Sequence, residues 1–273
     1  MTRPTLLGIL NITEDSFSDG GRHLDPTEAI AAARRLVAAG AEIIDVGAAA
    51  SNIAAKPVPP AEEIRRLEPV IAALKADRIR LSIDSFAPET QRFAIRQGAD
   101  FLNDIEGFSH PELYPDLAAA ECRLIVMHAV QGRGRAQRVA VAPGAIWKRI
   151  IDFFAARIAM LEAAGIARAR LILDPGMGFF LSSDAAASLR VLAGIEQLKQ
   201  EFGLPVLVSV SRKSFLAAIT GRDAPDARGA ASLAAELYAT ANGADYIRTH
   251  DPGALSDGLA VMAALAAEQS RSG

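Results

Sequence analysis

The sequence has a single cysteine and no excess of positive charge. The 273 residues include a single cysteine, Cys122, so an internal disulfide is excluded and a reducing compartment is favoured. The net charge of -3 provides no chain-wide positive field that would hold a phosphate backbone. We therefore expect no nucleic-acid partner.

Long apolar runs are missing as well. No stretch reaches the ~18 consecutive apolar residues that a membrane-spanning helix requires. The apolar run after Arg3 and Pro4 is about five residues long, which is too short for the core of a signal peptide. These absences predict no membrane association and a cytoplasmic protein.

Metal-binding and thiol motifs are scarce. The four histidines occur without HExxH spacing and no CxxC pair exists, so we expect no zinc site. An acidic DDxxD cluster is absent too. Any Mg2+ would therefore enter with a phosphorylated substrate, keep several of its waters and contact Asn11. Cys122 precedes a predicted strand and has no neighbouring base, so it is not expected to act as a nucleophile.

What the sequence does contain is an alternation of short apolar runs with longer alanine-rich stretches. This alternation predicts a parallel sheet with crossover helices. The predicted strands are Leu6 to Ile12, Glu42 to Gly47, Arg80 to Ser85, Asp100 to Ile105, Arg123 to His128, Arg170 to Gly176, Pro205 to Ser211 and Asp245 to His250.

The predicted helices lie between these strands, and several begin at proline, which the first turn of a helix accepts. They include Pro26 to Ala39, Pro60 to Ala76, Pro88 to Gln97, Ala145 to Ala164 and Arg228 to Ala241. A chain of 273 residues with 51% hydrophobic residues has the size of one α/β barrel of about 250 residues. We predict an α/β fold, a (β/α)8 TIM barrel forming a single domain over residues 1–273. An open doubly wound sheet is the minor alternative.

Most predicted strands end in a polar residue with defined chemistry. These residues are Asn11, Asp45, Asp84, Asn103, Asp104, His128, Asp174, Arg212, Lys213, Arg248 and His250. In a (β/α)8 barrel, the C-terminal strand ends and the loops that follow them build the active site. The shared position of these residues therefore predicts a site at that mouth.

Carboxylate, amide and cationic groups would meet there. Asp84, Asn103 and Asp174 can pair with a planar amidine-like edge, such as the edge of a pterin or a guanine. Lys213 would add a positive charge beside these three side chains. The mixture of signs indicates a ligand with both donor and acceptor faces.

A second part of the predicted site can hold phosphate. Arg248 and His250 lie two residues apart on one strand, so both side chains point to the same side and can donate to a phosphate or a diphosphate. The polar loop Thr13 to Gly21 ends in two glycines and can approach phosphates closely.

Together these residues resemble bacterial dihydropteroate synthases over nearly the whole chain. The segments that carry the resemblance are GILNITEDSFSDGG (Gly8 to Gly21), IIDVG (Ile43 to Gly47), SIDS (Ser82 to Ser85), LNDI (Leu102 to Ile105), VMH (Val126 to His128), LDPGMGF (Leu173 to Phe179), VSRKS (Val210 to Ser214) and IRTH (Ile247 to His250). The resemblance implies condensation of 6-hydroxymethyl-7,8-dihydropterin diphosphate with p-aminobenzoate in folate synthesis.

The resemblance also implies roles for individual residues. It implies that the pterin is contacted by Asp84, Asn103, Asp174 and Lys213. It implies that the diphosphate is contacted by Asn11, Ser51, Arg248 and His250, and that Asn11 also contacts Mg2+. The p-aminobenzoate pocket would be lined by Ser214, Phe179, Phe180 and Arg212. Lys213, Arg248 and His250 are the expected catalytic residues of an SN1-like reaction, in which the neutral arylamine needs no dedicated base.

Two segments depart from the family pattern. After the second predicted strand the usual Gly-Gly-Glu-Ser-Thr-Arg-Pro-Gly is replaced by residues 47–54, where Ser51 keeps a hydroxyl but Asn52 lacks the charge. After the sixth strand, Gly-Phe-Gly-Lys becomes Gly178-Phe179-Phe180-Leu181. Both departures resemble sulfonamide-insensitive dihydropteroate synthases of mobile resistance elements. We expect an aromatic wall that clashes with the drug but not with the substrate.

Two other functions stay open from the sequence. A corrinoid-linked methyltetrahydrofolate methyltransferase would use a similar pterin-binding barrel, although the Ser-Arg-Lys-Ser segment and the Arg248 and His250 pair favour a diphosphate substrate. A catalytically silent pterin-binding paralogue is suggested by the missing loop arginine. The resemblance further implies a homodimer, with the alanine-rich segment Ala254 to Ala267 as a candidate contact.

Overall fold

The computed structural model describes residues 2–13, 25–51, 53 and 56–272. Eight parallel strands form one sheet in the order β6-β5-β4-β3-β2-β1-β8-β7. The strands are β1 (Thr5–Asn11), β2 (Ile43–Gly47), β3 (Arg80–Asp84), β4 (Phe101–Asp104), β5 (Arg123–Met127), β6 (Leu171–Asp174), β7 (Leu207–Val208) and β8 (Tyr246–Thr249). A parallel bridge between Leu173 and Val206 joins the two ends of this order, so the sheet closes into a barrel. The predicted (β/α)8 barrel is confirmed and the open doubly wound sheet is excluded.

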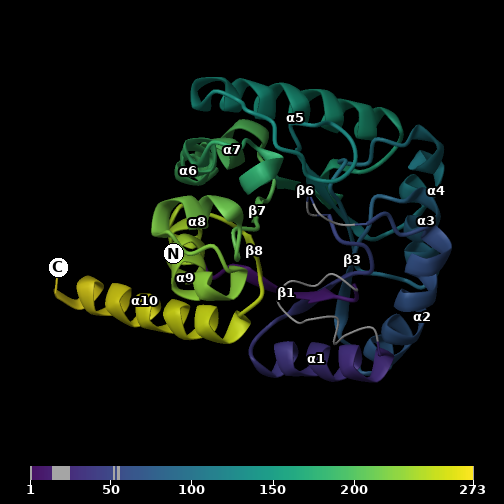
Figure 1. Cartoon of the computed structure of the whole chain (residues 1–273), viewed down its shortest axis with the longest axis horizontal. Coiled ribbons are helices and arrows are strands. Elements are labelled where there is room, and N and C mark those ends of the chain that lie inside the picture. The colour runs from purple at the N-terminus through teal and green to yellow at the C-terminus, as the bar shows by residue number, and fades with distance from the viewer. Residues whose placement is uncertain (1, 14–24, 52, 54–55, 273) are drawn as a thin grey trace.

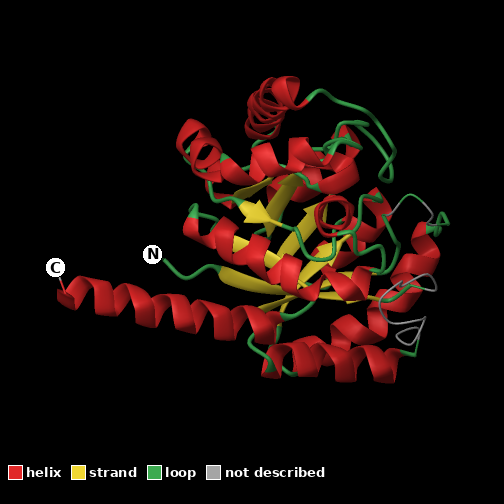
Figure 2. Cartoon of the chain, turned by 60° about the vertical axis from the view of Figure 1, so that its left-hand side comes forward, coloured by secondary structure: helices red, strands yellow, loops and turns green. Residues whose placement is uncertain are grey.

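Helices surround the strands (Figure 1). They are α1 (Pro26–Ala38), α2 (Pro60–Ala76), α3 (Pro88–Arg96), α4 (Tyr114–Ala119), α5 (Ile146–Ala163), α6 (Ala185–Ala193), α7 (Ile195–Phe202), α8 (Ser214–Thr220), α9 (Gly229–Ala241) and α10 (Pro252–Ser272). The last helix, α10, packs on α9 and then runs beyond the barrel to the C-terminal end (Figure 2). Within the described residues, no helix is long and apolar enough to cross a membrane.

The helix starts follow from local sequence. Proline occupies the first turn of α1, where its missing N–H costs no hydrogen bond. Asp25 caps α1, because its Oδ1 accepts from the backbone N–H of Thr27 at 2.7 Å. Glu28 in the first turn and Arg35 in the last turn also match the helix dipole.

The predicted elements agree with the structure to within one residue, except at two strands. β6 ends at Asp174, two residues early, and β7 is reduced to Leu207–Val208. Pro205 lacks the N–H that a sheet ladder uses, and the backbone N–H of Lys213 turns back to the Val210 carbonyl. The predicted strand Pro205 to Ser211 therefore begins late and ends early.

The barrel interior begins with a closed apolar layer, which we call the apolar floor. It consists of Leu7, Ile43, Phe101, Ile125, Ile172, Leu207 and Tyr246, all at most 9% exposed. Seven strands contribute one residue each. Since side chains alternate along a strand, the inward position two residues later lies one layer nearer the mouth.

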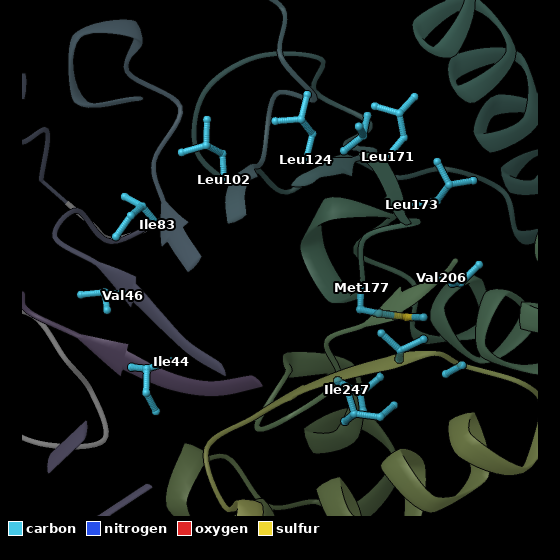
Figure 3. Close-up of a cluster of buried hydrophobic side chains, with 14 of the residues drawn as sticks. Ile44, Val46, Ile83, Leu102, Leu124, Leu171, Leu173, Met177, Val206 and Ile247 are labelled. Atoms are coloured by element: carbon cyan, nitrogen blue, oxygen red, sulfur yellow. The ribbon is translucent and has the colours of Figure 1, made fainter. Parts of the chain in front are cut away.

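The outer faces of the same strands carry a second apolar layer beneath the helices. Its strand members include Ile44, Val46, Ile83, Leu102, Leu124, Leu171, Leu173 and Ile247, and Val206 before β7 and Met177 after β6 join them (Figure 3). The seven strands that contribute to the floor therefore have apolar residues on both sides at their base, which is the pattern of a sheet buried on both faces. The polar strand ends are left for the mouth.

Candidate active site

A polar layer lies directly on the apolar floor. Asp45, Asn103, Asp174 and Arg248 each follow a floor residue by two positions, on β2, β4, β6 and β8. Their side chains consequently point into the barrel interior above the floor. The first three are buried. The structure thus brings together residues from strands that are far apart in the sequence.

The guanidinium of Arg248 joins two of these strands. Its Nε donates to Oδ2 of Asp45, and its Nη2 donates to Oδ2 of Asp84 at 2.7 Å. Asp45 is fully buried and lies 3.3 Å from the amide nitrogen of Asn103. Burial would lower the pKa of Arg248, but Asp45 and Asp84 together raise it above its usual value. The Arg248 cation is therefore fixed between two carboxylates.

Burial favours the neutral forms of Asp84 and Asp174. Burial raises the pKa of Asp84 to about 7 against the lowering effect of Arg248, and the nearby Asp45 adds to the rise. Burial also raises the pKa of Asp174 to about 6, although Oδ1 accepts from the Gly176 backbone N–H at 2.8 Å. A ligand edge with N–H donors matches these carboxyl groups.

Lys213 supplies the second cation of the site. Burial lowers the pKa of Lys213 to about 8, and Arg248 adds to the fall, while Asp174 and Asp84 oppose it. The Lys213 ammonium lies 5.2 Å from the centre of the Phe180 ring, within the range of a cation–π contact. Lys213 precedes α8, which begins at Ser214.

Ser214 faces the segment that follows β6. The Ser214 hydroxyl is 3.2 Å from the position that a Cβ would take at Gly178, and Gly178 has a positive φ of 65°. A side chain at residue 178 would therefore be strained and would press on Ser214. Phe180, in the short 3-10 helix Gly178–Phe180, is 5% exposed, and Phe179 is half-buried under the guanidinium of Arg138.

Three loops at the mouth are tied to one another. The Ser51 carbonyl, after β2, accepts from the Ala136 backbone N–H at 3.0 Å. The Val130 backbone N–H, after β5, donates to the Phe180 carbonyl at 2.9 Å. The loops after β2, β5 and β6 therefore share one wall of the mouth. Asn52 and residues 14–21 of the expected phosphate loop lie outside the described residues.

Asn11, Arg212 and His250 line a cavity of about 280 Å3 beside the mouth. Oδ1 of Asn11 lies 3.7 Å from the Cβ position at Gly47, where a side chain would fill the space between Asn11 and Asp84. Arg212, which stays a predicted residue of the p-aminobenzoate pocket, also lines this cavity, and its guanidinium pairs with Asp226 at 2.8 Å.

His250 is held neutral in that cavity. Burial lowers the pKa of His250 well below its usual value, and the cations Arg212, Arg248 and Lys213 add to the fall. Its Nδ1 lies 3.0 Å from Oγ of Ser211. His128, another strand-end residue, is buried, and its Nδ1 lies 3.1 Å from the Pro175 carbonyl. His128 therefore packs against the loop after β6 and does not face the open mouth.

Two residues important to this geometry were missed from the sequence. Asp45 was noted as a strand end but given no role, although it fixes Arg248. Arg66 of α2 is 8% exposed, and its Nη1 lies 3.4 Å from the Ile12 carbonyl and 3.3 Å from the Ala48 carbonyl. Arg66 thereby joins the ends of β1 and β2, where two mouth loops begin. The position of Asp45 at the end of a predicted strand could have indicated a role in the site. Nothing in the sequence indicated a role for Arg66.

Among the described residues, no group of three or more His, Cys, Asp or Glu side chains is arranged to hold a metal ion. The amide oxygen of Asn11 is a hard oxygen donor of the kind that Mg2+ accepts, but it is a single ligand from the protein. A magnesium ion at this position would need most of its ligands from water and from substrate oxygens.

Fold and site together define an α/β-barrel enzyme with buried carboxyl groups and two cations at its C-terminal mouth. The family model of pterin binding enzymes matches residues 7–250. The chain is 56% identical over 260 residues to dihydropteroate synthase type-2 of Escherichia coli, with 95% of each chain covered.

Solved structures agree with this match. The chain superimposes on a Xanthomonas albilineans dihydropteroate synthase with 4-aminobenzoic acid at a TM-score of 0.88 and 37% identity, covering 97% of this chain and 94% of that one. A Yersinia pestis dihydropteroate synthase in a sulfonamide complex also gives a TM-score of 0.88, at 33% identity, covering 97% and 95% of the two chains. The chain belongs to the pterin-binding enzymes and, within them, to the dihydropteroate synthases.

We expect Asp45→Asn to loosen the Arg248 guanidinium. The loss should lower the free energy of unfolding by about 2–3 kcal/mol, less than the ~3–5 kcal/mol for a buried charge left with no partner, because Asp84 remains. Urea unfolding measures the change. The matched control is Asp77→Asn, which removes the surface pair with Arg34 and should cost below ~1 kcal/mol. Equal losses in the two variants would show that Asp45 does not support Arg248.

Proposed function

We infer that the chain condenses 6-hydroxymethyl-7,8-dihydropterin diphosphate with p-aminobenzoate, giving 7,8-dihydropteroate and pyrophosphate. The observation that carries this function is the convergence of Asp84, Asp174, Lys213 and Arg248 at one barrel mouth. The relatives support the synthase and give no support to the corrinoid-linked methyltransferase. The neighbour that holds 4-aminobenzoic acid supports the second substrate.

For the pterin we propose Asp84, Asn103, Asp174 and Lys213. Two carboxylates accept from N–H groups of the pterin, while the Asn103 amide and the Lys213 ammonium serve its acceptor atoms. We propose that pterin binding exchanges the partners of Asp84, whose Oδ2 now accepts from Arg248. When pterin N–H groups donate to Asp84, Arg248 keeps its hydrogen bond from Nε to Asp45. The Nη nitrogens of Arg248 can then donate to the diphosphate.

For the diphosphate we propose Asn11, Ser51, Arg248 and His250. Asn11 and His250 line one cavity, and Arg248 lies on β8 two residues before His250, which follows the strand. Bound Mg2+ would neutralise charge on the diphosphate, with Asn11 as its one protein ligand. Arg248 and His250 would donate to the leaving oxygens without needing that ion to orient them.

The reaction we propose is SN1-like. Breaking the carbon–oxygen bond leaves negative charge on the diphosphate and positive charge in the pterin. Arg248 and His250 stabilise the first charge, and ionised Asp84 and Asp174 stabilise the second. p-Aminobenzoate then attacks through its neutral amine, which requires no general base near pH 7.

We further propose reduced sensitivity to sulfonamides. Phe180 packs between the Lys213 ammonium and a small apolar cluster that includes Ile105 and Met127. Phe179 and Ser214 complete the wall on which p-aminobenzoate would lie. A sulfonamide carries a substituent beyond the volume of p-aminobenzoate, so this aromatic wall opposes the drug alone. The Yersinia pestis enzyme of the same fold was solved in a sulfonamide complex, which supports the drug as a ligand of this barrel.

A homodimer is also proposed. Val261 and Leu265 on α10 are about 60% exposed, and Ile219 on α8 is 53% exposed. Exposed apolar side chains of this size are candidates for burial between copies. Light scattering should give the mass of two chains for the wild type. It should give the mass of one chain for one of the variants Leu265→Asp and Ile219→Asp, and that variant identifies the contact helix. A wild-type monomer would remove the proposal.

Pyrophosphate release tests the function directly. With pterin diphosphate, Mg2+ and p-aminobenzoate, we expect kcat/KM to rise with pH through about 7, because Asp84 must lose its proton to accept from the pterin. It should fall through about 8, because Lys213 then loses its charge. The alkaline fall should be absent from Lys213→Met, whatever the rate of that variant.

Two outcomes would contradict either the synthase activity or the proposed roles of Asp84 and Lys213. Pterin binding without pyrophosphate release would place the chain with the silent pterin-binding paralogues. Release with a flat profile from about pH 6 to about 9 would keep the synthase but remove the proposed roles of Asp84 and Lys213.

Phe180→Gly should make the enzyme more sensitive to sulfonamides. Removal of the ring opens the wall, so we expect the inhibition constant of the drug to fall about 10-fold or more while the KM of p-aminobenzoate stays within about twofold. Phe180→Leu keeps apolar bulk and serves as the control, with most of the discrimination retained. If Phe180→Gly leaves drug inhibition unchanged, the aromatic wall is not the source of discrimination.

A further inference from the structure

One buried carboxylate near the mouth has no part in the proposed reaction. Glu106 lies in the loop after β4 (residues 105–110, the β4 loop) and is 5% exposed. Its Oε1 accepts from the backbone N–H of Gly134 at 2.7 Å, and its Oε2 accepts from the Ser109 hydroxyl at 2.8 Å. Gly134 belongs to the loop after β5 (residues 128–142, the β5 loop). The side chain of Glu106 therefore joins two loops at the C-terminal ends of neighbouring strands.

The β4 loop is a stiff support for this carboxylate. Asp104, fully buried at the end of β4, accepts from the backbone N–H groups of Glu106 at 2.7 Å and of Phe108 at 3.0 Å. Phe108 is buried and has a φ of 60°, which a bulky residue keeps only when its surroundings enforce it. The Arg157 guanidinium donates to the Phe108 carbonyl at 2.8 Å. The β4 loop can therefore hold Glu106 in one position.

The β5 loop has less support of its own. Gly132 and Gly134 both have a φ of 76°, and a Cβ at either position would meet nothing within 4 Å. Arg133 and Arg138 in the same loop are exposed. Loops with few buried contacts open locally at a low free energy. The position of this loop therefore depends on hydrogen bonds to its neighbours, and the bond to Glu106 has a carboxylate acceptor, which is the stronger kind.

The β5 loop in turn supports the aromatic wall proposed for p-aminobenzoate. Ala136, two residues after Gly134, is 7% exposed and packs in one apolar cluster with Phe180. The Ala136 backbone N–H donates to the Ser51 carbonyl at 3.0 Å, so the same residue meets the loop after β2. A β5 loop that is held at Gly134 thus keeps Ala136 in contact with the Phe180 cluster.

We propose that Glu106 is a positioning residue for drug discrimination: it holds the β5 loop at Gly134, so that Ala136 supports Phe180 and the aromatic wall does not move aside for a sulfonamide. A wall excludes a bulky ligand only if its displacement costs free energy. The last step rests on the proposed p-aminobenzoate site and its wall. The attachment of the β5 loop by Glu106 depends on neither.

Limited proteolysis with trypsin tests the attachment. Arg133 and Arg135 flank Gly134, so trypsin cleaves there when the loop opens. Glu106→Leu keeps a side chain of similar size but removes the acceptor. We expect cleavage after these two arginines to be about 10-fold faster than in the wild type, which is the effect of about one hydrogen bond on the open population. Equal cleavage of the wild type and a folded Glu106→Leu would overturn the proposal.

Two variants serve as controls for Glu106→Leu. Glu106→Gln keeps an acceptor for the Gly134 N–H, so its cleavage should stay within about twofold of the wild-type rate. Glu112→Leu removes an exposed carboxylate of the same segment, which pairs with His110 at 3.0 Å, and should be cleaved like the wild type. Fast cleavage of Glu112→Leu would show that any lost carboxylate loosens the segment, and would overturn the specific role of Glu106.

Amide hydrogen exchange in the wild type gives a readout that needs no variant. The Gly134 N–H donates to Glu106 and should exchange at least about 10-fold more slowly than in an unstructured peptide of the same sequence. A Gly134 amide that exchanges at the peptide rate would overturn the proposal, even if Glu106→Leu does not fold.

Drug discrimination is measured as the inhibition constant of the sulfonamide divided by the KM of p-aminobenzoate. We expect this ratio to fall about 5-fold or more in Glu106→Leu and to stay within about twofold in Glu106→Gln. The KM of the pterin diphosphate should stay within about twofold in both variants, because none of its proposed contacts lies on the β5 loop. Phe180→Gly should also lower the ratio, and adding Glu106→Leu to it should cause no further fall, because both changes act on one wall.

The outcomes separate this proposal from the proposals on which it rests. Additive falls in the double variant would show that Glu106 does not act through Phe180, and would overturn the proposed discrimination. If Phe180→Gly keeps the wild-type ratio, the aromatic wall fails. If the wild type releases no pyrophosphate, the proposed function fails. In both of these cases, proteolysis and hydrogen exchange still decide whether Glu106 holds the β5 loop.

Discussion

The site depends on one buried guanidinium, that of Arg248, held between Asp45 and Asp84. A cation above an apolar floor is costly to bury unless carboxylates and hydrogen bonds compensate it. The barrel provides this compensation by bringing β2, β3 and β8 to the same mouth, where Asp45, Asp84 and Arg248 meet. Closure of the strand ring, helix packing and the position of the mouth loops all serve to keep these three side chains together.

The same ion pairs compensate the charges of the site. Asp84 accepts from Arg248, so neither of these groups is left unpaired. In the proposed complex, N–H groups of the pterin replace Arg248 at Asp84, and anionic oxygens of the diphosphate accept from Arg248.

The sequence was sufficient to place the eight strands, although β6 and β7 are shorter than predicted, and to bound the helices α1, α2, α3, α5 and α9 to within one residue. Parallel β-strands and amphipathic helices leave local periodic patterns, and proline marks several helix starts. Partners such as Asp45 and Arg248 are separated by 203 residues, so no local pattern indicates that they meet.

We propose that Arg248 moves from Asp84 to the diphosphate when the substrate binds. The most direct measurement is a crystal structure with the pterin diphosphate bound. We expect hydrogen bonds from the pterin ring to Asp84 and Asp174, and from Arg248 to a phosphate oxygen, with the Arg248 and Asp45 pair intact. A bound pterin diphosphate beside an unbroken Arg248 and Asp84 pair would show that no such exchange takes place.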